Sequence, residues 1–116
     1  MAAPRRIEKI NNLLKDELAN LLNREFEFTP ANLVTITRVV ASPDLHYAKI
    51  MLSIIGQNRG RVLEILKKNI YDIQQDLNRR LRFRPIPKIT FTLDEEEEKR
   101  EVIEKSLAEL KQKGDV

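Results

Sequence analysis

The sequence predicts an α+β protein in which two helices cover one face of a three-stranded sheet and a further helix follows. Residues 47–55 alternate between apolar and polar side chains, which is the period of a strand with one buried face. Other segments carry apolar residues at steps of three and four, the period of a helix that packs on one side. The 116 residues suffice for one domain.

The first helix is expected from Pro4, which suits a first helical turn, to about Arg24. Arg5, Arg6 and Lys9 cluster at its start, where cations oppose the helix dipole. Helix stability therefore does not explain them, and they either bind a ligand or lie on a frayed end. The apolar stripe of this helix consists of Ile7, Ile10, Leu14, Leu18, Leu21 and Leu22.

Residues 34–55 predict a β-hairpin whose turn, residues 42–45, has the sequence Ser-Pro-Asp-Leu. The second strand, 47–55, turns one set of side chains inward, namely Ala48, Ile50, Leu52 and Ile54. The first strand alternates less regularly, because its apolar pairs fall on opposite faces, namely Val34 with Ile36 and Val39 with Ala41. One extra residue near Thr37 and Arg38 brings both pairs to one face, so a β-bulge is predicted there.

A second helix is expected from about Arg61 to Leu81, and the prolines at 85 and 87 end it. Its predicted buried stripe is Val62, Ile65, Leu66, Ile70, Ile73, Leu77 and Leu81. A third strand follows at 88–93, with Ile89, Phe91 and Leu93 directed inward. Because a strand-helix-strand unit connects 47–55 to 88–93, we expect these two strands to lie side by side and parallel.

The last helix is expected to begin at Asp94, which forms a capping box with Glu97. The acidic run 95–98 suits the first turn of a helix, although a role in binding or autoinhibition is the alternative. The apolar stripe of this helix is Val102, Ile103, Leu107 and Leu110. We therefore divide the chain into a domain at 1–93 and a C-terminal helix with its tail at 94–116.

The composition argues against several classes of protein. There is no cysteine, no apolar run long enough to cross a bilayer, and no apolar core of a signal peptide, so a cytoplasmic protein is expected. The single histidine, His46, lies beside the predicted turn, and no Ser-His-Asp set, metal-ligand spacing or phosphate-binding glycine loop is present. We therefore expect no enzyme, no catalytic residue and no metal site.

Charge is distributed unevenly along the chain. Residues 1–93 carry a net charge of +7 and residues 94–116 a net charge of −4. The densest basic stretch, 79–84, has four arginines in six residues, more than stabilisation of a helix C-terminus requires. This pattern favours a polyanion partner, contacted through phosphates because aromatic residues are only 5%. The candidate RNA-binding residues are Arg5, Arg6, Lys9, Lys67, Lys68, Arg79, Arg80, Arg82 and Arg84.

Two stretches of the sequence, together with the arginine-bearing first helix, resemble bacterial ribosome-binding factor A. One is 35–53, with its Ser-Pro-Asp-Leu turn, and the other is 81–91, followed by Asp94. The resemblance extends over roughly residues 5–110. It implies a KH-like, type II α-β-β-α-β fold without catalytic activity or cofactor. It also implies an assembly factor that binds free small (30S) ribosomal subunits near the 5′ end of their RNA during late processing.

The sequence departs from the family pattern at two places, and like the family it lacks the Gly-x-x-Gly loop of ordinary KH domains. Residues 69–71 read Asn-Ile-Tyr where the family has Ala-x-Gly, which predicts a weaker kink in the second helix. Residues 29–31 read Thr-Pro-Ala instead of Asp-Pro-Arg, so phosphate contact from that arginine is not expected.

The expected partners are the small ribosomal subunit and its RNA, with no membrane and no small-molecule substrate, and the expected state is a monomer. A protein-interaction module is the alternative function. It would use the outer hairpin face around Tyr47, Lys49 and Met51, or the stripe of the last helix. Salt separates the two, because phosphate contacts weaken steeply with added salt and an apolar protein interface does not.

Overall fold

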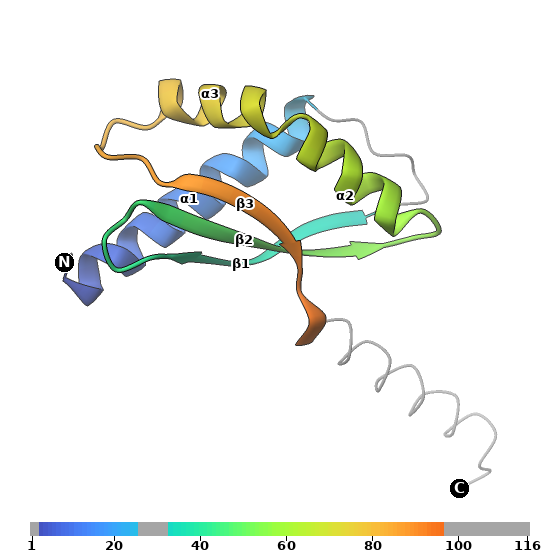
Figure 1. Cartoon of the computed structure of the whole chain (residues 1–116), viewed down its shortest axis with the longest axis horizontal. Coiled ribbons are helices and arrows are strands. Elements are labelled where there is room, and N and C mark those ends of the chain that lie inside the picture. The colour runs from blue at the N-terminus through green and yellow to red at the C-terminus, as the bar shows by residue number, and fades with distance from the viewer. Residues whose placement is uncertain (1–2, 26–32, 97–116) are drawn as a thin grey trace, which may run out of the picture.

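The structure is a computed structural model that describes residues 3–25 and 33–96. Figure 1 shows helices packed over a twisted sheet. In chain order the elements are α1 (Pro4–Glu25), β1 (Leu33–Ala41), β2 (Tyr47–Ile55), α2 (Arg59–Lys68), α3 (Ile70–Arg80) and β3 (Lys88–Leu93). The predicted order of helices and strands is confirmed up to β3, with one difference inside the second helix.

The three strands form one sheet with β2 in the centre. β1 pairs with β2 in the antiparallel sense. β3 pairs with the other side of β2 in the parallel sense, from Tyr47 opposite Lys88 to Leu52 opposite Leu93. The predicted parallel neighbour is therefore confirmed, and the long connection through α2 and α3 is what returns the chain to the same end of the sheet.

All three helices contribute to one hydrophobic core on a single face of the sheet. α1 buries the predicted stripe except for half-buried Ile7, and β2 and β3 bury their inward residues except for half-buried Leu93. α1 lies over β1, whereas α2 and α3 lie over β3. The buried residues of the core include Leu14, Leu18, Leu21, Ile50, Leu52, Leu66, Ile73, Leu77 and Ile89. The opposite face of the sheet stays uncovered among the described residues.

The predicted β-bulge is confirmed, with Thr37 as the extra residue. The register passes directly from Ile36 opposite Leu52 to Arg38 opposite Met51. The Thr37 hydroxyl donates to Oδ2 of Asp94 at 2.6 Å and also lies 3.2 Å from the Met51 carbonyl oxygen. This contact joins the bulge in β1 to the residue that follows β3, the strand at the opposite edge of the sheet.

Asp94 precedes the expected last helix and is also hydrogen-bonded to the sheet. It is buried, and its backbone N–H donates to the carbonyl of Leu52 at 2.7 Å. Glu95 and Glu96 are helical. Glu97 and the apolar stripe of the expected helix lie outside the described residues, so the capping box and the domain boundary after 93 stay predictions.

The expectation of one continuous second helix is wrong, because the helix is interrupted at Asn69. Asn69 has φ −96° and ψ 10°, and its side-chain Nδ2 donates to the carbonyl of Ile65 at 2.8 Å. The backbone N–H of Asn69 donates to the same carbonyl at 3.1 Å, so two donors of one residue meet at the end of α2. Asparagine often makes such local side-chain contacts with backbone carbonyls, and the break involves no glycine. The predicted buried stripe is also wrong at Ile65, which is 39% exposed. Leu63 packs against the core instead, so the buried face of α2 is rotated away from Ile65.

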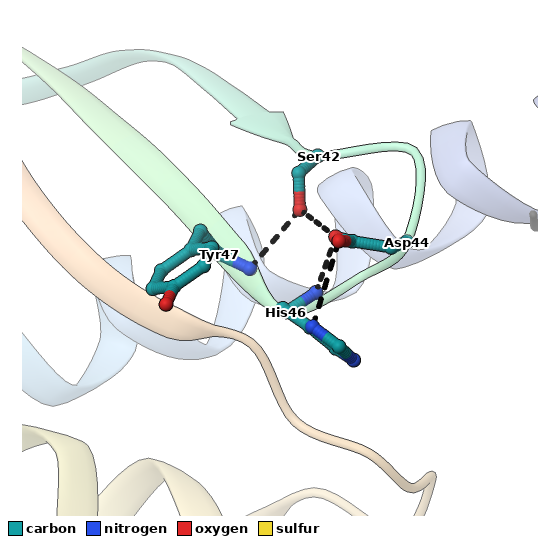
Figure 2. A network of polar contacts seen from close by, with 4 residues as sticks. All are labelled: Ser42, Asp44, His46 and Tyr47. Atoms are coloured by element: carbon teal, nitrogen blue, oxygen red, sulfur yellow. Dashed lines mark hydrogen bonds and ion pairs between the residues drawn. The ribbon is translucent and has the colours of Figure 1, made fainter.

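The hairpin turn is held by side chains, as Figure 2 shows. The carboxylate of Asp44 accepts from the Ser42 hydroxyl at 2.6 Å and from the His46 backbone N–H at 3.0 Å. The Ser42 hydroxyl oxygen in turn accepts from the Tyr47 N–H at 3.1 Å. Leu45 takes φ 60° and is nevertheless buried, so the network holds a strained residue against the core.

Thr37→Val replaces the bulge hydroxyl with a methyl group of the same shape. We expect a loss of about 1–2 kcal/mol in the free energy of unfolding, because Asp94 loses a hydrogen bond in a buried place. Urea denaturation measures it. Thr35→Val, at an exposed strand position nearby, is the control and should change stability little. Equal effects of both variants would contradict a specific role for the bulge contact.

The turn should also respond to acid. Hydrogen bonds from the Ser42 hydroxyl and then from the His46 N–H lower the pKa of Asp44 below its ordinary value. The stabilisation is therefore complete above the unfolded-state pKa and is lost as the pH falls through the folded-state pKa. We expect the difference in urea midpoint between the wild type and Asp44→Ala to shrink on acidification, and a constant difference would contradict this account.

Candidate RNA-binding surface

A groove brings cations from the start of α1 together with cations from the end of α3. It lies between the first half of α1 and the segment that leaves α3, and its volume is about 600 Å³. We call it the basic groove, and its lining residues are Arg6, Lys9, Ile10, Leu13, Arg80, Leu81, Arg82 and Phe83. Four of the nine predicted RNA-binding residues therefore share one surface.

The helical period of α1 determines which of its residues line the groove. Arg6, Lys9 and Leu13 follow one another at steps of three and four, so they lie on one helix face. That face adjoins the buried stripe and turns toward α3. Glu17 continues the same face, and its Oε1 lies 3.7 Å from Nε of Arg80. Since Glu17 also lies 3.9 Å from Arg24, one carboxylate is shared by two arginines.

The floor of the groove is apolar. Ile10 is buried, Leu81 and Phe83 are half-buried against the core, and Leu13 is 40% exposed. The cations stand around this floor, and all four are exposed. The arrangement therefore places four exposed cations around an apolar surface.

Arg84 holds the wall of the groove in place. After Arg80 the chain becomes extended at Leu81, which ends α3. The Nη1 group of Arg84 donates to the carbonyls of Leu81 and Phe83, each at 2.8 Å, and Nη2 donates to the carbonyl of Asn78 at 3.1 Å. This guanidinium binds the backbone that presents Arg82 and Phe83, so we assign it a positioning role.

The other predicted residues lie outside the groove lining. Arg79 is exposed and paired with Asp76. Lys67 and Lys68 end α2 beside the break at Asn69, where Lys68 borders a shallower hollow. Arg5 is exposed next to the groove residue Arg6. These cations extend the positive surface but do not converge on one point.

Sequence reasoning misses the apolar part of this surface. It does not single out Leu13 or Phe83, and it assigns Ile10 to the core alone. A signal is present for Leu13, since an apolar residue at the helical period of Arg6 and Lys9 lies on their face. Nothing in the sequence indicates that α1 and the end of α3 are neighbours.

Other kinds of site find little support in the described residues. No group of three or more acidic or histidine side chains in 3–25 and 33–96 could hold a metal ion. None of the described helices is long and apolar enough to span a bilayer. On the uncovered sheet face Tyr47 is 61% exposed, Lys49 is exposed and Met51 is half-buried. The residues named for the alternative, a protein-binding surface, are therefore accessible to a partner.

A protein-family model described as ribosome-binding factor A matches residues 6–107. This chain belongs to the ribosome-binding factor A family. A relative from Natranaerobius thermophilus is 36% identical over 90% of this chain and 82% of its own length. Another, from Bdellovibrio bacteriovorus, is 33% identical over 95% of this chain and 84% of its own length.

Structures of ribosome-binding factor A from another organism share the fold of this chain. The crystal structure of ribosome-binding factor A from Thermus thermophilus superposes with a TM-score of 0.63 at 23% identity, covering 75% of this chain and 93% of that one. A Thermus thermophilus homology model fitted into a cryo-EM map of a 30S complex gives a TM-score of 0.60 at 24% identity, covering 71% and 88%. The expected KH-like α+β fold is confirmed.

Arg84→Lys tests the positioning role of Arg84. Lysine keeps the charge but lacks the planar fork that reaches three carbonyls, so we expect a loss of about 1 kcal/mol in the free energy of unfolding. Urea denaturation measures it. Arg79→Lys, in an exposed ion pair, is the control and should change stability little. A stability loss no larger than that of the control would show that Arg84 does not hold the wall.

Proposed function

We propose that this protein binds free small ribosomal subunits and contacts their RNA through the basic groove during late maturation of the 5′ end of that RNA. Membership of the ribosome-binding factor A family supports the ribosomal partner. A relative of the same fold was fitted into the map of a 30S complex. The proposal places the protein in the cytoplasm as a monomeric binding protein rather than an enzyme.

The observation that carries the RNA contact is the convergence of Arg6, Lys9, Arg80 and Arg82 on one groove. Cations that neutralise phosphates release counterions, which gives affinity without reading a sequence. Arginine forks match the geometry of phosphate oxygens. Surface cations scattered singly around the molecule would give weaker and less defined contact.

The mechanism is occupancy of a site on the RNA. The groove docks on the RNA and stabilises the local conformation to which it binds, as any ligand favours the state that it binds more tightly. The protein leaves when maturation removes that conformation. Arg5, Lys67, Lys68 and Arg79 act as outer contacts that add long-range attraction.

The test is sedimentation of the purified protein with free small subunits, free large subunits and joined ribosomes across a salt series. We expect binding to free small subunits alone, with a steep loss as salt rises. In Arg80→Ala/Arg82→Ala the slope of log affinity against log salt should flatten by about 2, because two phosphate contacts are lost.

Arg38→Ala/Lys49→Ala is the matched control, because it removes the same charge from the uncovered face of the sheet. It should leave the slope nearly unchanged. Equal flattening by both double variants would show that only net charge matters and would reject the groove as the contact. Binding that hardly responds to salt would favour the protein-interaction alternative through that uncovered face.

A further inference from the structure

We propose that the basic groove holds one unpaired nucleotide of the RNA, with its base against the apolar floor and its flanking phosphates on the cationic rim. The inference rests on the proposed RNA contact and goes further, because it names the element of RNA that is bound. The residues that would contact the nucleotide are Leu13, Phe83 and the four cations of the groove.

The apolar floor is the first argument. A surface that contacts only the backbone of an RNA duplex meets phosphates and sugars, since the bases are paired and stacked inside. Such a surface gains nothing from Leu13, which stays 40% exposed between Lys9 and the end of α3. An unpaired base removes this apolar surface from water, and Phe83, which also lines the groove, is an aromatic residue of the kind on which bases stack.

The size and the charge of the groove are the second argument. A volume of about 600 Å³ lies in the range of clefts that enclose small organic ligands, and far exceeds what one phosphate needs. Cations stand on both walls, Arg6 and Lys9 on α1, and Arg80 and Arg82 on the other side. A strand that places a base between the walls therefore brings a phosphate to each side.

The walls are also connected, which favours a preformed site. Glu17 of α1 lies 3.7 Å from Nε of Arg80, and Arg84 fixes the backbone between Asn78 and Phe83. A site held in its binding geometry loses less conformational entropy when the ligand arrives. Because every base has a stacking face and the floor offers only apolar groups, the groove should accept any base.

The experiment compares short RNA probes on the full chain. The first is an oligouridylate of about eight nucleotides, and the second is the same sugar-phosphate backbone without bases. Both probes carry the same number of phosphates, so the cationic rim should contribute equally to the affinity for each of them. We expect the oligouridylate to bind about fivefold more tightly than the abasic strand.

Leu13→Ala then locates the base. We expect this variant to weaken oligouridylate binding about threefold with an unchanged salt slope, because an apolar contact releases no counterions. Binding of the abasic strand should not change. Ile65→Ala is the matched control, since Ile65 is 39% exposed on a helix and also borders cations, in the hollow of α2. It should affect neither probe.

Several outcomes would overturn the inference. An abasic strand that binds as tightly as the oligouridylate would show a backbone contact only. A Leu13→Ala effect that is equal on both strands would place the base elsewhere. Uridine monophosphate that binds as tightly as the oligouridylate would assign the groove to a free nucleotide instead of an RNA strand.

The inference and the proposed function fail separately. Salt-dependent sedimentation with small subunits, together with equal affinity for the abasic strand, leaves the proposed function and removes the base from the groove. Tighter binding of the oligouridylate that depends on Leu13, without sedimentation on any subunit, leaves an RNA-binding groove and removes the ribosomal partner.

Discussion

The bulge at Thr37 is the constraint on which the rest of this structure depends. Without the extra residue, the apolar pairs on the two halves of β1 would face opposite sides of the sheet. With it, Ile36 and Val39 are both buried on the helical side. α1 lies over this strand, so the position of α1, and with it one wall of the basic groove, follows from a register shift of one residue.

The topology then decides where the groove is. The parallel pairing of β2 and β3 forces the chain to return through α2 and α3 to the end of the sheet that carries the hairpin turn. The backbone N–H of Lys88 donates to the carbonyl of His46 at 2.9 Å, which joins the returning loop to the turn. α1 begins at this same end (Figure 1), so the N-terminal cations meet the arginines that precede β3.

The sequence predicted the strands, their partners and the bulge because periodicity reports which face of an element is buried. It did not predict the break at Asn69, since the contact of an asparagine side chain with a carbonyl of its own helix depends on local geometry. For the site it predicted all four cations of the groove, but not that they would meet. That juxtaposition depends on the packing of α1 beside α3, which no local pattern encodes.

The arginines of 79–84 show that a count of charges in the sequence does not tell which of them face a groove and which contact the chain itself. Arg79 is paired with Asp76, and Arg84 donates to three backbone carbonyls. Arg80 and Arg82 line the groove, and Arg80 does so beside the carboxylate of Glu17. Residues of one type in one short stretch thus divide between binding the chain itself and lining the groove. Only two of the four arginines line the groove, and apolar side chains form the rest of its surface, so the shape of a candidate binding surface has to be considered together with its charge.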